Sequence, residues 1–349
     1  MCRAGLIVFV VGLLACLSAS ASNEPSLADL PKQAIERSQI TLPGSQPFHL
    51  KAKVYESTDR DNDSHNAEIE EYWVSPDKWR REVKSAGFSE MVVVNGGKTQ
   101  EKSDGDYYPN WLRSIVDGIF DPGAPLDGVD LAKSGDTPIA TRTPDGALTI
   151  GDVGAEVCRR FMFLASNPPV TNKVFSSYCF RQGLLESVGL PGYEIDYSDY
   201  RKFGGKQVAR KVGEYIESGT ELAAEITELT DLTSPDESLF TLNQTSAPLR
   251  TVVIVEQTLR SLIVSAPAIV WPTLTSGRNP GTLSIYVCID RQGHVRETYG
   301  LNSDNPIMTA AAREQVMKWQ FKPASAQGVP VQVESILTFG YETKIVPTN

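Results

Sequence analysis

Hydrophobic and polar residues alternate in short runs between residues 48 and 232, and this pattern predicts a domain of mostly antiparallel strands. Turn-forming residues such as Gly204-Gly205 separate the runs, as they do in β-hairpins. In residues 111–120 the hydrophobic positions recur at helical spacing, and a short helix is also expected at 27–37. The predicted strands are 48–56, 68–74, 78–84, 89–95, 156–164, 174–181, 193–202, 207–216 and 221–232.

A second pattern begins near residue 281 and predicts a small unit with the order strand, strand, helix, strand. Residues 282–290 alternate cleanly, and a hairpin turn leads into a second strand at 295–301. Asn305 and Pro306 are typical of the N-cap and first position of a helix. The last predicted strand is 331–341. One helix laid on a three-stranded antiparallel sheet buries one hydrophobic face, which makes an α+β unit.

Two motifs in this unit resemble the C-terminal domain of TonB energy transducers. They are Trp319-Gln320-Phe321-Lys322-Pro323-Ala324 and Gly328-Val329-Pro330-Val331, and they follow the strand pair in the order found in that family. Trp271-Pro272 stands where the family usually has Tyr-Pro, which is a mild departure. The resemblance covers residues about 268–345 and implies a ββαβ domain.

The same resemblance implies a binding function. In that family the last strand of the sheet pairs with extended segments of outer-membrane transporters, because an exposed strand edge offers unpaired N–H and C=O groups. The partner expected here is therefore a segment of an outer-membrane or envelope protein. Outward side chains of the strand, such as those of Gln332, Glu334 and Thr338, are expected to set specificity. The matching edge strand comprises Val331, Gln332, Val333, Glu334, Ser335, Ile336, Leu337, Thr338 and Phe339.

The N-terminal domain resembles the LolA/LolB-like fold of outer-membrane lipoprotein carriers, which is an open barrel with helices in its mouth. The resemblance is carried by the run from Trp73 to Arg80 and by the late strands followed by Pro235 to Phe240. Members of that fold bind acyl chains, so the resemblance implies a hydrophobic cavity. This leaves an alternative function open, namely a lipid or lipoprotein carrier with an acyl-chain ligand in the N-terminal domain.

The N-terminus has the pattern of an export signal. Arg3 precedes an apolar run at residues 6–17, and Ala19-Ser20-Ala21 is a small-x-small cleavage pattern. A removed signal peptide is predicted at 1–21, while a lipidated Cys16 or an uncleaved anchor remain open alternatives. Each reading places the protein in the periplasm or at a membrane facing it. The predicted domains are 22–242, a linker at 243–267, and the TonB-like domain at 268–349.

Cys158 and Cys179 lie in two predicted strands joined by a turn around Pro168-Pro169. If the hairpin is centred there, the two cysteines face each other directly. Directly opposed Cβ atoms lie about 4.5–5.5 Å apart, close to the spacing that a disulfide requires. We therefore predict a cross-strand disulfide between Cys158 and Cys179. Cys288 is then left without a partner in the mature chain.

The composition argues against several function classes. The chain has 33 Lys and Arg against 43 Asp and Glu, a net charge of −10, which is a poor match to nucleic acid. Its three histidines, His49, His65 and His294, are far apart, and no nucleotide-binding or hydrolase motif occurs. We therefore expect a binding protein and not an enzyme, with no cofactor and no metal site.

Overall fold

The computed structural model describes residues 30–57, 63–123, 140–142, 148–150, 156–162, 175–190, 193–216, 221–275, 279–303 and 305–345. The predicted signal segment at 1–21, with Cys16, lies outside these residues. No helix in the described part of the chain is long and apolar enough to cross a membrane.

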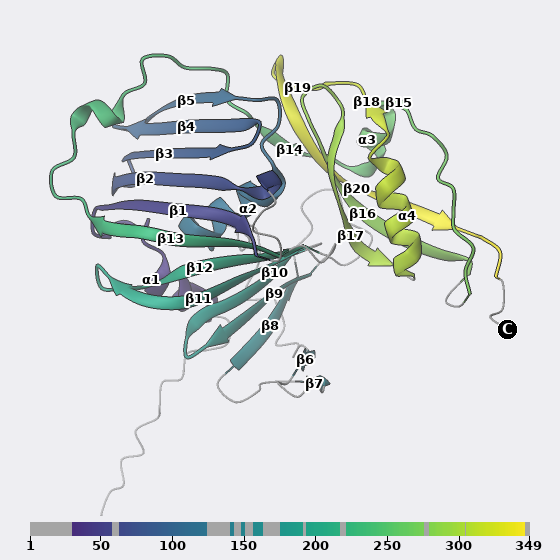
Figure 1. The fold of residues 1–349 in the computed structure, drawn as a ribbon, viewed down its shortest axis with the longest axis horizontal. Coiled ribbons are helices and arrows are strands. Elements are labelled where there is room, and N and C mark those ends of the chain that lie inside the picture. Colours follow the sequence, from purple (N-terminus) through teal and green to yellow (C-terminus); the bar gives the residue numbers. More distant parts are fainter. Residues whose placement is uncertain are drawn as a thin grey trace, which may run out of the picture.

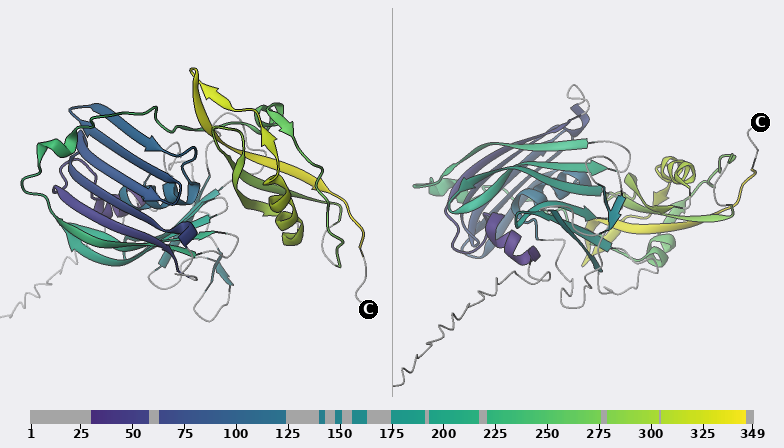
Figure 2. Two further views of the ribbon diagram at one scale, coloured as in Figure 1. Left: turned by 45° about the horizontal axis from the view of Figure 1, so that its top comes forward. Right: turned by 90° about the horizontal axis from the view of Figure 1, so that it is seen from below.

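The N-terminal domain is built on one eleven-stranded sheet in which every neighbouring pair is antiparallel (Figure 1). The strand order is β5-β4-β3-β2-β1-β13-β12-β11-β10-β9-β8. The sheet is curved and stays open, because β5 and β8 end it without pairing with each other (Figure 2). The strands are β1 (Phe48–Glu56), β2 (Ala67–Ser75), β3 (Lys78–Ser85), β4 (Phe88–Asn95), β5 (Lys98–Asp104), β8 (Glu156–Met162), β9 (Phe175–Arg181), β10 (Leu184–Leu190), β11 (Tyr193–Phe203), β12 (Lys206–Ile216) and β13 (Glu221–Asp231).

The predicted antiparallel β domain is thus confirmed, with two strands that the alternation did not reveal. One of them, β5, is almost entirely polar, and the other, β10, follows β9 after a two-residue turn. A separate pair, β6 (Ala140–Arg142) and β7 (Leu148–Ile150), forms its own two-stranded sheet.

Two helices pack against the large sheet, α1 (Leu30–Ser38) and α2 (Asn110–Phe120). The second helix has an apolar side that includes Leu112, Ile115, Val116 and Ile119, and most of its side chains are buried against β11, β12 and neighbouring strands. An amphipathic helix packs its apolar side against the core, since that side would otherwise leave apolar surface in water. The interior of the N-terminal domain is therefore filled by α2.

The register of β8 and β9 places Cys158 directly opposite Cys179, as the hairpin predicted. The disulfide itself stays a prediction. Intact-mass analysis of the mature protein before and after reduction is expected to differ by two hydrogens. Replacing Cys179 by serine is expected to lower the free energy of unfolding by about 3 kcal/mol, because the cross-link restricts the unfolded chain. The matched control is Cys288→Ser tested in the same way; equal masses before and after reduction contradict the disulfide.

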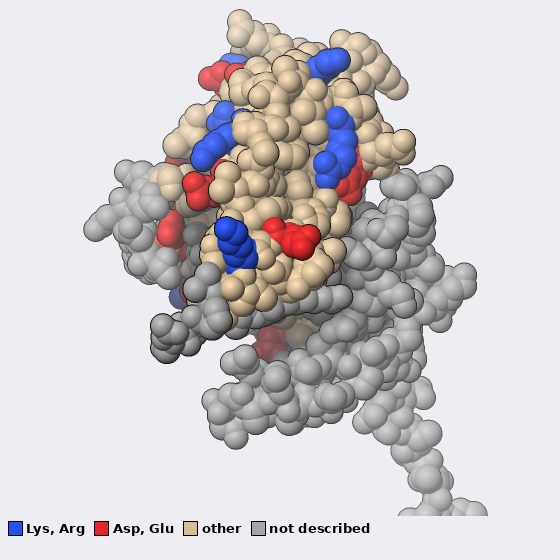
Figure 3. Space-filling model, turned by 90° about the vertical axis from the view of Figure 1, so that its right-hand side faces the viewer, with Lys and Arg blue, Asp and Glu red and all other residues tan. Residues whose placement is uncertain are grey.

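The C-terminal domain contains the predicted three antiparallel strands with one helix, α4, packed on them, and a fourth strand, β14, pairs parallel to β20 and was not predicted. The sheet order is β14-β20-β16-β17, and α4 packs on β16 and β17. The Asn305 side chain accepts a hydrogen bond from the Ile307 backbone N–H at 3.0 Å, and Pro306 is the first helical residue. The face of this domain seen in Figure 3 has few charges, scattered in both signs. The elements are β14 (Thr251–Val253), β16 (Gly281–Ile289), β17 (Val295–Ser303), α4 (Pro306–Val316), β19 (Ala324–Ala326) and β20 (Val329–Tyr341).

The segment predicted as a linker, 243–267, has a defined structure. It contains β14, the helix α3 (Glu256–Ser261) and β15 (Ile263–Ser265). β15 pairs with β18 (Gln320–Phe321), and the backbone N–H of Lys322 donates to the Leu262 carbonyl at 2.7 Å. Its later part therefore packs with the C-terminal domain, while the Ser246 backbone N–H near its start donates to the Glu101 carbonyl of β5 at 2.9 Å.

Candidate functional site

The outer edge of β20, the strand predicted to dock a partner, is partly occupied by the protein itself. β14 runs parallel to it, with Thr251 to Val253 opposite Gln332 to Glu334. The Gln332 backbone N–H donates to the Arg250 carbonyl at 3.0 Å, and the Ile254 N–H donates to the Glu334 carbonyl at 2.9 Å. The first part of the predicted edge therefore already has its backbone partners.

Two side chains of the same stretch, those of Gln332 and Glu334, face the N-terminal domain. Gln332 is 1% exposed and Glu334 is 4% exposed. The Gln332 amide oxygen accepts from the Tyr108 backbone N–H at 3.0 Å, and its nitrogen donates to the Tyr108 carbonyl at 3.3 Å. Our expectation that Gln332 and Glu334 point outward to set specificity is therefore wrong, because the domain interface covers them.

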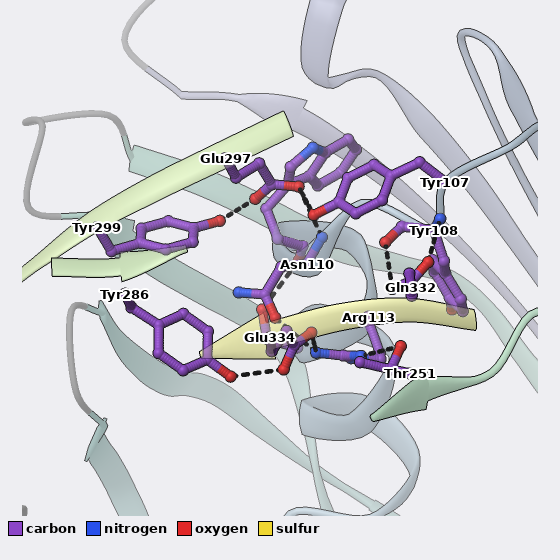
Figure 4. A network of polar contacts seen from close by, with 12 residues as sticks. Tyr107, Tyr108, Asn110, Arg113, Thr251, Tyr286, Glu297, Tyr299, Gln332 and Glu334 are labelled. Atoms are coloured by element: carbon purple, nitrogen blue, oxygen red, sulfur yellow. Dashed lines mark hydrogen bonds and ion pairs between the residues drawn. The ribbon is translucent and has the colours of Figure 1, made fainter. Parts of the chain in front are cut away.

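Glu334 is the centre of the first half of a polar network at this interface (Figure 4). Its carboxylate forms an ion pair with Arg113 of α2 and accepts a hydrogen bond from the Tyr286 hydroxyl at 2.5 Å. The Arg113 guanidinium also donates to the Thr251 hydroxyl and to the Asn110 side-chain oxygen, both at 2.7 Å. One arginine thus connects three separate segments of the chain.

Glu297 of β17 is the centre of the second half. Its carboxylate accepts from the Tyr107 hydroxyl at 2.7 Å, from the Asn110 backbone N–H at 2.8 Å, and from the Tyr299 hydroxyl. Burial raises the pKa of Glu297, and the two hydroxyl donors oppose that rise by stabilising the charged form. Glu297 thus has two donors from the N-terminal domain and Glu334 has one, so buried hydrogen bonds join the two domains.

Farther along β20, beyond Glu334, no strand pairs with its outer edge in the described residues. By strand alternation, Ile336, Thr338 and Gly340 direct their backbone groups to that edge. The Thr338 N–H donates to the Glu256 carboxylate at 2.9 Å, and the Arg260 guanidinium donates to the Thr338 carbonyl at 2.9 Å. Two side chains of α3 therefore satisfy the backbone of the residue that a partner strand could pair with.

The other residues of the predicted edge strand are buried or partly buried. Val331, Val333 and Leu337 are buried in the core, Ser335 is buried and donates to the Ile254 carbonyl at 2.8 Å, and Phe339 is partly buried. Thr338 is the one exposed member of the predicted set.

Among the described residues, α2 fills much of the space where the N-terminal domain was expected to have an acyl-chain cavity. A cavity of about 20 Å³ remains between the helices and the sheet, lined by Gly118, Tyr197 and Val212 among others. A space of this size holds roughly one water molecule. Within the described residues of this region, an acyl chain would enter only if α2 moved out.

The three histidines lie apart, and each approaches a carboxylate: His49 beside Glu70, His65 beside Glu56, and His294 beside Asp290. Among the residues that the structure describes, no group of three or more potential ligands could hold a metal ion.

Residues 275–343 match the family described as Gram-negative bacterial TonB protein C-terminal. No protein with a curated description matches the chain. Solved structures similar to it include a LolA superfamily protein from Nitrosomonas europaea, at 10% identity and a TM-score of 0.34, covering 62% of this chain and 97% of that one. Another is a DUF1329 family protein from Desulfovibrio piger, at 8% identity and a TM-score of 0.36, covering 61% and 95%.

Proposed function

We propose that this is an envelope binding protein of the Gram-negative type, whose C-terminal domain docks an extended segment of a partner protein by strand addition to β20. The family match at residues 275–343 supports the class of domain. The observation that carries the proposal is the outer edge at Thr338, whose N–H and C=O are bonded only to the side chains of Glu256 and Arg260. The backbone of an incoming peptide offers a C=O acceptor in place of the Glu256 carboxylate and an N–H donor in place of the Arg260 guanidinium.

The geometry sets two ways for a partner to bind. A short segment pairs with the backbone of residues 336–340 and displaces only the side-chain bonds of α3. A longer segment must also displace β14, which pairs with β20 over three residues. That pairing is parallel, and parallel pairs are slightly less stable per residue than antiparallel ones.

The proposal includes export through the segment at 1–21 and a partner in the outer membrane. The carrier alternative has no such supporting contact, because α2 fills the interior where an acyl chain would lie. We therefore retain strand addition as the single proposed function.

The test is Thr338→Pro, because proline removes the outward N–H at this edge while the ladder to β16 keeps its bonds. Thr338→Val is the matched control, since it changes the side chain and keeps the N–H. A heptapeptide selected from a random library against the unaltered mature protein serves as the probe. We expect Thr338→Pro to weaken its affinity by about tenfold in fluorescence anisotropy, roughly the loss of one well-placed interaction.

Thr338→Val is expected to bind the probe nearly as well as the unaltered protein. Circular dichroism of both variants checks that the fold is retained. Equal affinity in the proline and valine variants would falsify docking at this edge.

A further inference from the structure

The opposite edge of the C-terminal sheet is formed by β17. In the described part of the chain β17 ends the sheet order and has β16 as its only strand neighbour. The Thr298 carbonyl points to the open side, where it accepts a hydrogen bond from the Arg313 guanidinium of α4 at 3.1 Å. The register of β16 and β17 shifts at Arg296, which is a β-bulge, a feature common at sheet edges and beside binding sites.

This edge lies in a cleft of about 420 Å³ between the two domains. The volume is within the range typical of ligand-binding pockets, about 300–1,000 Å³. Four consecutive residues of β17, from Arg296 to Tyr299, line the cleft. At roughly 3.3 Å per residue they span about 10 Å, which matches three or four residues of an extended peptide.

The walls of the cleft combine apolar rings with positive charge. His65 and Trp111 stand edge to face with centroids 5.3 Å apart, and Tyr107 carries the Arg296 guanidinium at 5.7 Å from its ring. Met317, 41% exposed, lines the side formed by α4. An aromatic or aliphatic side chain would bury its surface against these groups.

The charges in the cleft favour an acidic ligand. Arg313 forms no ion pair with any residue that the structure describes, and the Arg296 side chain is 51% exposed and has one weak ion pair there, 3.4 Å from Asp290. The acidic lining residue, Glu297, is occupied by its three donors at the domain interface (Figure 4). The arginines are therefore the groups available to an incoming charge.

We propose that this cleft binds an extended peptide segment of a partner protein that adds as a strand to β17, with an acidic side chain at Arg313 and Arg296 and an apolar one against Trp111 and Met317. Arginine suits this role because its planar guanidinium forms two parallel hydrogen bonds with a carboxylate. The inference does not depend on docking at β20, since the two edges lie on opposite sides of the sheet.

The test uses a fluorescein-labelled heptapeptide in which aspartate alternates with valine and phenylalanine, added to the full mature protein. We expect saturable binding in fluorescence anisotropy. Binding is expected to fall about tenfold in Arg313→Gln, the size of one charge-assisted contact. Arg201→Gln is the matched control, because Arg201 lies outside both sheet edges in an exposed ion pair with Asp199, and it should leave the affinity unchanged. If Arg313→Gln does not fold, as judged by circular dichroism, Arg296→Gln takes its place.

Two chemical variants of the probe test the strand geometry without altering the protein. In a peptide strand, alternate backbone nitrogens point to opposite edges, so methylating one set of alternate nitrogens blocks one edge of the peptide. One of the two methylation patterns should therefore abolish binding and the other should not. Equal binding of both patterns, or of a lysine-for-aspartate peptide, overturns the proposal. A loss in Arg201→Gln as large as that in Arg313→Gln shows that the effect is not specific to the cleft and also overturns it.

Discussion

Replacing Arg113 by alanine is expected to lower the free energy of unfolding by about 3–5 kcal/mol, because it leaves a buried carboxylate without its counter-charge. Glu334 is 4% exposed, and Arg113 is its ion-pair partner. The same change removes the hydrogen bonds that Arg113 donates to Thr251 and Asn110. Urea denaturation followed by circular dichroism measures the loss.

Two further variants test whether the Arg113–Glu334 ion pair affects stability more than an exposed ion pair does. Arg201→Ala removes an exposed ion pair with Asp199 and should change stability little. The double variant Arg113→Met with Glu334→Leu removes both charges, and it should recover much of the stability because no lone charge stays buried. If Arg113→Ala lowers the free energy of unfolding no more than Arg201→Ala does, the result contradicts a stabilising ion pair between Arg113 and Glu334 at the domain interface.

Replacing Leu112 by alanine is expected to lower the free energy of unfolding by about 2–5 kcal/mol, since it leaves a cavity where α2 fills the N-terminal domain. The Leu112 side chain is 0% exposed. Thermal and urea unfolding measure the change, and Ile307→Ala, at a side chain 57% exposed, is the control with a small expected effect.

The same variant also bears on the lipid-carrier alternative. If Leu112→Ala costs little stability and the protein acquires lipid from an extract in native mass spectrometry, then α2 is a movable plug, and the interior of the domain is the cavity expected of a carrier. If Leu112→Ala lowers the free energy of unfolding as expected and the protein takes up no lipid, the interior of the domain is permanently filled.

The sequence predicted the elements well wherever one face of an element is buried. The strand at 282–290 and the helix at 111–120 have regular patterns because each presents a continuous apolar side to a core. β5, with the sequence KTQEKSD, is an edge strand with little buried surface, so its pattern has no apolar period. The backbone pairing of Cys158 with Cys179 followed from the hairpin alone.

The domain interface was missed because its residues are distant in sequence and individually unremarkable in pattern. One signal was present: Arg113 is the only basic residue in an otherwise largely apolar helix. A buried arginine requires a carboxylate partner, but nothing in the sequence points to Glu334, 221 residues away. The pairing of β14 with the outer edge of β20 was also not predicted, because the three residues of β14 are too few to show a strand pattern.

Because β14 and α3 belong to the same chain as β20, they act as a built-in competitor for any longer segment that approaches that edge. Tethered groups compete at an effective concentration on the order of millimolar. A dilute free peptide therefore loses to them, whereas a segment held nearby by a second contact, or offered at high local density in a membrane, can win. The arrangement selects partners by proximity as well as by sequence.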